Sequence, residues 1–283
     1  MYQLENDALK LECIERAGQM SHLIDKKNNT EILYQGDQGW SGRNPTLFPL
    51  VGNTYSGSYE INGRTYAMKN HGLIRYLDLK GNQRDDAIIF TYDADETTKA
   101  QYPFDFHYEM KYTLDGNAVH IDYMIKNTGV EVMPFSFGLH PAFRVPQREG
   151  ETYEEYTLRF AQEENCRQCI FGNGPSHWEN RTFHEWKVDR QDIYRYATIV
   201  YDNLKSKYVT LFHQDEARLR VHFDGFRYLA LWTHPTPSDF LCIEPWMGHA
   251  DYDDVDVDFY HREGTQLLEP NQSWSIGYVI EIL

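Results

Sequence analysis

The segment Tyr112-Thr-Leu-Asp-Gly-Asn-Ala-Val-His-Ile-Asp-Tyr123 carries the clearest indication of fold class in this 283-residue sequence. Asp115-Gly116 is a turn signal, and apolar residues alternate with polar ones on either side of it. Alternation with a period of two is typical of half-buried strands, and an Asp-Gly pair between two such runs indicates a hairpin. The segment therefore predicts two antiparallel strands joined by a tight turn.

The same pattern recurs through most of the chain. Asn62-Gly63 and Asp224-Gly225 each separate two strand-like runs, which predicts two further hairpins. Helical spacing is nowhere sustained, and residues 176–195 are expected to be long connections over the sandwich. Turn signals at strand spacing, without intervening helices, predict an all-β fold, a large antiparallel β-sandwich. No linker or repeat divides the chain, so a single domain over residues 1–283 is expected.

Composition and charge exclude several classes of function. The sequence has 43 acidic and 27 basic residues, a formal net charge of −16, and no cluster of Lys and Arg. A nucleic-acid-binding protein needs a basic stripe, so no nucleic-acid partner is expected. The chain starts without a secretory signal, and no stretch approaches 18 consecutive apolar residues. We therefore expect a cytoplasmic protein that does not contact membranes.

Two patterns raise the question of a metal site. Cys166-Arg-Gln-Cys169 has the spacing of a zinc-binding or redox-active pair, but no second pair follows at zinc-finger spacing. The acidic run 251–258 could suggest calcium, yet it lacks the glycine and the closing glutamate of a known calcium loop. Incidental thiols and a solvated acidic segment are the favoured interpretation, with a cation at 251–258 as the open alternative.

Four short segments combine Pro, Gly and aromatic residues with polar side chains, a mixture typical of irregular backbone that carries functional groups. They are Gly42-Arg-Asn-Pro-Thr-Leu-Phe-Pro49, Asn70-His-Gly-Leu-Ile-Arg75, Phe135-Ser-Phe-Gly-Leu-His-Pro-Ala-Phe143 and Cys242-Ile-Glu-Pro-Trp-Met-Gly-His249. In this order, the segments resemble those of the aldose 1-epimerase family, and more narrowly its LacX-like branch. The resemblance spans nearly the whole chain and implies a galactose mutarotase-like supersandwich.

Carried over by position, the resemblance implies roles for individual residues. His140 matches the family's general acid, and Glu244 matches its general base. Arg43 and His71 match the Arg and His that bind the sugar. Arg75 resembles a ligand-binding Arg of the hexose-6-phosphate epimerases in the same superfamily. The resemblance thus implies an isomerase whose partner is a small-molecule sugar.

Further binding residues are less well marked. The family supplies an Asp that holds sugar hydroxyls, and Asp202 is the first candidate here, with Asp192 as the second. Aromatic side chains can pack against the apolar face of a sugar, and the candidates are Trp246, Phe48 and Trp232. No metal or organic cofactor is expected, because the reaction needs only one acid and one base.

The chemistry explains why a His and a Glu suffice. Interconverting α and β anomers requires a base that takes the proton of the C1 hydroxyl and an acid that protonates the ring oxygen. Reclosure of the ring on the other face reverses both transfers, so each group needs a pKa near the operating pH. Histidine meets this with little tuning, whereas Glu244 needs burial, for example beside Ile243 and Trp246.

Several alternatives stay open at this point. Taken singly, Glu244 could belong to a structural buried ion pair, and Arg75 could pair with Asp78. A carbohydrate-binding protein without turnover would use the same fold and the same aromatic residues. A hexose-6-phosphate 1-epimerase is open because of Arg75. A glycoside hydrolase would need two carboxylates beside the glycosidic bond, and Glu244 alone stands in such a segment. The aldose and the oligomeric state are left open.

Overall fold

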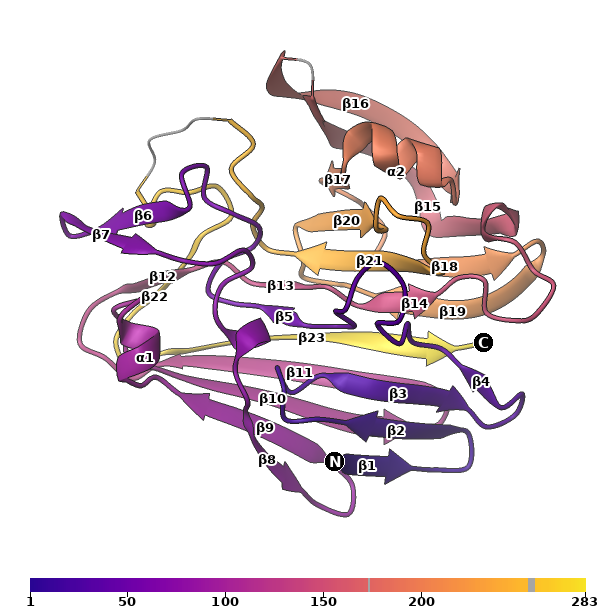
Figure 1. Cartoon of the computed structure of the whole chain (residues 1–283), viewed down its shortest axis with the longest axis horizontal. Helices are drawn as coiled ribbons and strands as arrows, with labels where there is room; N and C mark the ends of the chain where they lie inside the picture. The colour runs from indigo at the N-terminus through magenta and orange to yellow at the C-terminus, as the bar shows by residue number, and fades with distance from the viewer. Residues whose placement is uncertain (173, 254–257) are drawn as a thin grey trace.

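The computed structural model describes residues 1–172, 174–253 and 258–283, and about half of them lie in β-strands (Figure 1). The strands are β1 (Tyr2–Glu5), β2 (Leu9–Cys13), β3 (Met20–Asp25), β4 (Thr30–Glu31), β5 (Thr46–Leu47), β6 (Ser58–Ile61), β7 (Arg64–Ala67), β8 (Lys80–Gln83), β9 (Ile88–Asp93), β10 (Phe106–Asp115), β11 (Ala118–Asn127), β12 (Met133–Phe135), β13 (Gly138–Leu139), β14 (Ala142–Arg144), β15 (Tyr156–Gly172), β16 (Gly174–Lys187), β17 (Ile199–Asp202), β18 (Tyr208–His213), β19 (Glu216–His222), β20 (Tyr228–Trp232), β21 (Phe240–Trp246), β22 (Gln266–Leu268) and β23 (Ser273–Ile282).

These strands form one large sheet and smaller ones beside it. The large sheet runs in the order β5-β13-β21-β20-β17-β15-β18-β19-β23-β11-β10-β9-β8, with β14 on β21 and β16 on β15. A second sheet contains β1 to β4, and β6-β7 and β12-β22 are two-stranded. Neighbouring strands are antiparallel, as in the long pair β10-β11 and the pair β20-β21. The predicted all-β, antiparallel supersandwich is thereby confirmed.

The sheet of β1 to β4 packs against the β8 to β11 end of the large sheet, as the lower part of Figure 1 shows. Every second residue of β2 is buried in the core between the sheets, and the residues between them are partly exposed. The rings of Tyr2 and Phe90 meet edge to face at 5.1 Å. The Tyr112 hydroxyl donates a hydrogen bond to the Gly18 carbonyl at 2.9 Å. Aromatic residues thus fill much of this interface.

The helices are short. They are α1 (Glu96–Lys99), α2 (Arg190–Tyr196) and two 3₁₀ turns, Ile74–Tyr76 and Tyr153–Glu155. Side chains cap both α-helices, because Asp95 accepts from the Thr98 amide and Asp189 accepts from the Gln191 amide. Among the residues that the structure describes, no helix has the length and apolar character needed to cross a membrane.

Two of the three predicted hairpins are confirmed. Asn62-Gly63 is the loop between β6 and β7, and both residues have positive φ, as the favoured two-residue hairpin turn requires. In the second hairpin Asp115 pairs with Ala118, so the loop is Gly116-Asn117, shifted by one residue from the predicted turn. Local turn chemistry therefore located these hairpins to within one residue.

Two other predictions were wrong. Asp224-Gly225 does not close a hairpin, because β19 pairs with β18 and β23 whereas β20 pairs with β17 and β21. Residues 176–195 are not long connections, since most of them form β16, which pairs with β15, and α2. β16 lies at an edge of the sheet, where charged side chains are tolerated and discourage pairing with other chains, so its alternation is weak in the sequence.

The spacing of Cys166 and Cys169 does not bring their thiols together. Both lie on β15, where residues three apart point to opposite faces of the sheet. Cys166 packs in the main core, whereas Cys169 packs beside Val200 and Trp246. Both thiols are free, which agrees with the interpretation that they are incidental.

Candidate active site

A cavity of about 410 Å³ opens where β15, β17, β20 and β21 meet the loops that follow β4, β5, β7 and β13. This volume lies within the range of small-molecule sites. The structure brings five of the seven predicted site residues to its walls: His71, Arg75, His140, Glu244 and Trp246. They come from segments far apart in the sequence, so the fold itself assembles them.

Strand β21 sets the side chains of the cavity floor. Its residues are buried on both faces, and alternation sends Leu241 and Ile243 into the main core. Cys242, Glu244 and Trp246 therefore share the opposite face. A shift of the strand by one residue would exchange the two sets.

Neighbouring strands hold β21 closely at this point. Trp246 Nε1 donates a hydrogen bond to the Leu139 carbonyl at 3.2 Å, which ties β21 to β13. Gly138 lies directly opposite Trp246, and a Cβ atom there would come within 2.7 Å of the indole Cδ1. Glycine at this position therefore lets the indole close over the segment that leads to His140.

His140 and Glu244 form a buried pair. His140 Nε2 lies 3.5 Å from Glu244 Oε2, and their side chains are 8% and 1% exposed. Among the described residues, neither His140 Nδ1 nor Glu244 Oε2 has a hydrogen-bond partner. A buried acid and a buried base that lack protein partners are free to exchange protons with a ligand.

Burial shifts the pKa values of His140 and Glu244 in opposite directions. It raises the pKa of Glu244 well above 4.5, and the positive charge of Arg75 offsets part of that increase. Burial also lowers the pKa of His140 from 6.5 to about 3, and Arg75 acts in the same direction. Between these limits the pair holds one proton, which these directions place on Glu244 while His140 is neutral.

Aromatic rings fix the orientation of His140. Trp40 stacks on its imidazole with centroids 4.7 Å apart and planes inclined by 28°. Trp232 and His71 meet the same ring edge to face, each at 5.4 Å. In many active sites a carboxylate orients the histidine through Nδ1, but here ring packing has that task.

We expect Trp40→Ala to lower kcat about two- to tenfold, the range that corresponds to the loss of one aromatic pair. Without the stacked indole, the imidazole of His140 can rotate away from the reacting atoms. Trp40→Phe should restore most of the loss. Steady-state kinetics of anomer exchange separate kcat from KM. A rise in KM at unchanged kcat would show instead that Trp40 only binds the sugar.

His71 is held in one tautomer by the backbone. Its amide donates to the Gly52 carbonyl at 2.8 Å, and the Gly52 amide donates back to His71 Nδ1 at 3.0 Å. Nδ1 is therefore an acceptor, and the neutral ring carries its proton on Nε2, where it can donate to a ligand. Burial lowers the pKa of His71 well below 6.5, so the ring stays neutral.

The backbone at this point is unusual. His71 has φ +65° and the following Gly72 has φ +76°. A Cβ at Gly72 would lie 2.4 Å from the Phe48 carbonyl oxygen, so only glycine fits there. The left-handed pair turns the chain sharply and presents the imidazole to the cavity.

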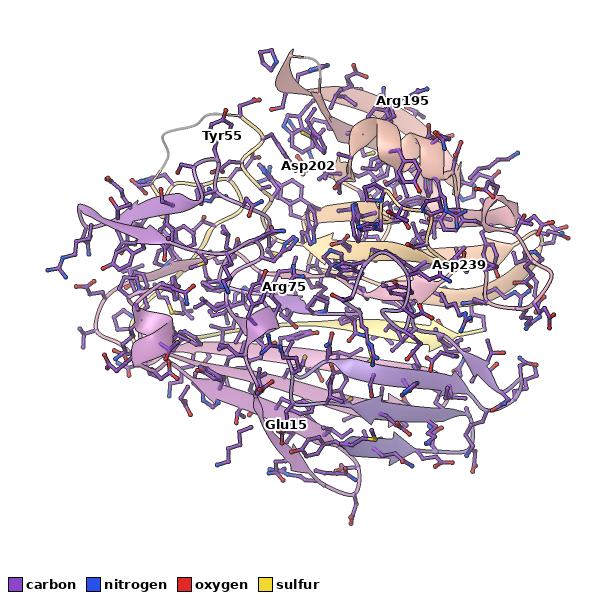
Figure 2. The ribbon with its side chains drawn as sticks, in the orientation of Figure 1. Glu15, Tyr55, Arg75, Arg195, Asp202 and Asp239 are labelled. Atoms are coloured by element: carbon purple, nitrogen blue, oxygen red, sulfur yellow. The ribbon has the colours of Figure 1, made fainter. Side chains whose placement is uncertain are left out.

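Arg75 supplies the positive charge of the cavity. It belongs to the 3₁₀ turn Ile74–Tyr76, and burial lowers the pKa of its guanidinium. In the described part of the chain Arg75 makes no salt bridge, and Asp78 lies 3.8 Å from Arg16 instead. Figure 2 labels Arg75 near the middle of the molecule. Its charge is thus available to a ligand.

Two predicted residues and one predicted platform do not line the cavity. The Arg43 guanidinium donates to the Gln35 carbonyl at 3.2 Å and approaches the Ser21 carbonyl at 3.5 Å. The Phe48 ring is fully buried in the core, 5.1 Å from Phe106. Both belong to the segment 42–49, none of whose residues lines the cavity.

Asp202 is also placed outside the cavity lining. Its side chain is fully buried, receives hydrogen bonds from Arg227, with Nε at 3.2 Å, and pairs with Arg167. Val200, two residues earlier on β17, lines the cavity instead. Asp192, the second candidate, lies on α2 and is likewise absent from the described lining. Figure 2 shows Asp202 beside β17, apart from Arg75.

Sequence reasoning missed several lining residues. They are Gly52, Asn53, Asn70, Phe171, Thr198, Val200, His234, Ala250, Tyr252 and, with the largest role, Trp40. A signal for Trp40 was present, since glycines at 36, 39 and 42 surround it and mark an irregular loop with one large side chain. Trp232, considered as a sugar platform, does line the cavity.

The acidic run is largely engaged by the protein where it is described. Residues 254–257 lie outside the described residues, so only its ends can be assessed. Asp251, Asp253 and Asp258 accept hydrogen bonds from Arg262, Ser176 and His261, respectively. A different set could hold a metal ion: one ligand atom each from His140, Cys242 and Glu244, all within 4.8 Å of one another.

Several known proteins are similar to this chain in sequence or in structure. LacX of Lactococcus lactis subsp. lactis is 30% identical over 261 residues, which cover 87% of each chain. A galactose mutarotase related enzyme from Lactobacillus acidophilus superposes with a TM-score of 0.92 at 24% identity, over 100% of this chain and 97% of that one. A galactose mutarotase-like protein from Lactobacillus casei gives 0.91 at 24% identity, over 100% of both chains.

The two solved structures establish the fold, and sequence comparison establishes the family. The model of the family described as aldose 1-epimerase matches residues 1–281. That match includes each of the four segments and every residue of the His140–Glu244 cavity. The chain therefore belongs to the aldose 1-epimerase family.

Proposed function

We propose that this chain catalyses the interconversion of the α and β anomers of an aldose. The observation that supports this most strongly is the buried His140–Glu244 pair, with 3.5 Å between Nε2 and Oε2. The two oxygens that exchange protons in the reaction, the C1 hydroxyl and the ring oxygen, are both bonded to C1. An acid and a base must therefore lie close together to serve them, and this pair does.

The proposed reaction begins after the shared proton has passed from Glu244 to His140, which makes His140 the acid and Glu244 the base. Glu244 takes the proton of the C1 hydroxyl while His140 protonates the ring oxygen, and the bond between C1 and the ring oxygen breaks. Rotation about the C1–C2 bond turns the other face of the aldehyde to the ring hydroxyl. Reclosure returns the first proton to C1 oxygen from Glu244 and the second to His140, so nothing is consumed.

Other cavity residues would hold the sugar. His71 presents an Nε2 donor, and Arg75 provides charged donors that form no salt bridge with any described residue. The indoles of Trp40, Trp232 and Trp246 supply flat apolar surface for the face of a pyranose ring. These groups suit a neutral hexose, and Arg75 also suits a phosphorylated one.

We expect the acid limb of the pH profile of anomer exchange to lie below pH 6.5. The active state needs one proton on the pair, so activity falls at low pH only when both members are protonated. The lowered pKa of His140, about 3, places that limb below the ordinary histidine value of 6.5. Activity falls at high pH when the last proton leaves the pair, and the raised pKa of Glu244 places this alkaline limb well above pH 4.5. Exchange rates from about pH 4 to about pH 9 test this; an acid limb centred above 6.5 would contradict it.

The test of the function is NMR exchange spectroscopy on glucose, galactose and their 6-phosphates. We expect magnetisation transfer between the α and β anomeric protons of at least one sugar, above the rate without protein. Faster exchange of a 6-phosphate than of the free sugar would select the hexose-6-phosphate reaction, which the unpaired Arg75 supports.

The same panel separates the alternatives. Saturable binding of a sugar without accelerated exchange would identify a carbohydrate-binding protein and overturn the proposal. A glycoside hydrolase needs two carboxylates beside the bond, whereas among the described lining residues Glu244 is the single one. Cleavage of a chromogenic glycoside would nevertheless count against an epimerase.

A further inference from the structure

Cys242 lies beside the catalytic pair without a part in the proposed reaction. It precedes Glu244 by two residues on β21 and therefore shares its face of the strand. Its thiol is fully buried and free, among apolar neighbours that include Tyr34, Trp40 and Phe240. The proposed reaction does not use a thiol. The position of the Cys242 thiol behind the acid and the base therefore suggests a different role for it.

The distances suit a small metal ion. One ligand atom each from His140, Cys242 and Glu244 lies within 4.8 Å of the other two. In tetrahedral zinc sites, bond lengths of about 2.0 to 2.3 Å place ligand atoms roughly 3.4 to 3.7 Å apart. The His140 Nε2 to Glu244 Oε2 distance of 3.5 Å already meets this spacing. Small side-chain rotations would bring in the sulfur.

Two further observations point to a ligand at this place. Glu244 Oε2, which lies 3.5 Å from His140 Nε2, is a buried polar atom without a hydrogen-bond partner among the described residues. Both residues line the cavity, so an ion can reach them from solvent, with Cys242 directly behind. A set of one sulfur, one imidazole nitrogen and one carboxylate oxygen favours zinc over magnesium or calcium.

The charges set a limit on the affinity. A thiolate and a carboxylate together neutralise a divalent cation, but the positive charge of Arg75 acts on the same pair and opposes it. The site therefore fits a weak or regulatory ion better than a permanent structural one, which would need a fourth protein ligand.

We propose that His140, Cys242 and Glu244 bind a zinc ion, and that the bound ion blocks anomer exchange because it occupies both the acid and the base. The blocking part rests on the proposed function, whereas the binding part does not. The ion would convert the reaction centre into a three-ligand metal site with one position open to water.

Cobalt(II) titration of the full chain tests the binding directly. A cysteine ligand gives a thiolate-to-cobalt absorption band in the near ultraviolet, which requires no enzyme activity. We expect this band in the wild type, its loss in Cys242→Ser, and its retention in the matched variant Cys13→Ser, since Cys13 is also fully buried but lies on β2, in the core between the two sheets. Zinc should displace the cobalt and abolish the band. Circular dichroism and thermal melts establish that each variant is folded.

Inhibition is the second measurement. Zinc should inhibit anomer exchange in the wild type at concentrations at least about tenfold lower than in Cys242→Ser, each measured against its own activity without zinc, and a chelator should reverse it. Absence of the band, or its persistence in folded Cys242→Ser, would overturn the site. A band without inhibition would overturn the blocking role. A Cys242-dependent band in a chain without exchange activity would leave the metal site standing and refute the proposed function alone.

Discussion

Glu244→Gln is expected to lower kcat/KM for anomer exchange by about 10²- to 10⁴-fold, the range lost when a general base is removed. The amide has the shape of the carboxyl group, so the sugar should still bind, but it cannot accept the proton of the C1 hydroxyl. His140→Asn should cause a loss of similar size because it removes the group that protonates the ring oxygen. NMR exchange spectroscopy and polarimetry with a freshly dissolved anomer both measure the loss.

The substitution Glu244→Gln should also stabilise the fold. Burial raises the pKa of Glu244 in the folded state, so its contribution to stability is full below pH 4.5 and declines as the pH rises toward the folded pKa. Glutamine has no such titration. We therefore expect the stability of Glu244→Gln relative to the wild type to be higher at pH 8 than at pH 4.5. Thermal melts at both pH values provide the measurement.

Matched variants on the outer face of the sheet serve as controls. Glu109→Gln and His120→Asn make the same chemical changes on β10 and β11, away from the cavity. They should retain full activity and wild-type melting. Full activity in both Glu244→Gln and His140→Asn would refute the assignment of acid and base.

The double variant Arg167→Met, Arg227→Met is expected to lose about 3 to 5 kcal/mol of unfolding free energy. It leaves the fully buried Asp202 carboxylate without either of its two guanidinium partners. Asp202→Asn should cost less, about 1 to 3 kcal/mol, because the two arginines are 39% and 38% exposed and can turn to solvent. The two expected losses differ because the carboxylate of Asp202 is buried, whereas the guanidinium groups of Arg167 and Arg227 are partly exposed.

Urea denaturation with global fitting gives these free energies. Asp202→Asn should leave kcat and KM at wild-type values below its melting temperature, because Asp202 does not line the cavity. A rise in KM without a loss of stability would instead support the role that the family resemblance implies for this aspartate. Equal destabilisation by Asp202→Asn and the double variant would contradict the electrostatic explanation.

The segments that could be predicted from the sequence are those in which local chemistry and family order coincide. Glu244 and Trp246 lie on an apolar strand where a carboxylate is costly, and His140, His71 and Arg75 lie in short segments of fixed order. For these five residues the fold had only to bring the segments together, which the large sheet does.

The failures share a different cause. Asp202 looked like a hydroxyl ligand, but its partners Arg167, on β15, and Arg227, just before β20, could not be seen along the chain. Asp224-Gly225 is a good turn signal, yet the strands on both sides find their partners elsewhere in the sheet. Local patterns predict turns and exposure, whereas ion pairs and strand neighbours depend on long-range packing.

The alternation of β21 links the formation of the cavity to the folding of the sheet. Ile243 and Glu244 are adjacent and face opposite sides, so a strand misplaced by one residue would bury a carboxylate in the apolar core and leave the cavity without its base. The free energy of such a misfolded state would be too high for the state to persist. Recovery of activity after denaturation should therefore follow the completion of the central sheet. The time course of recovered activity would then report how fast the sheet forms.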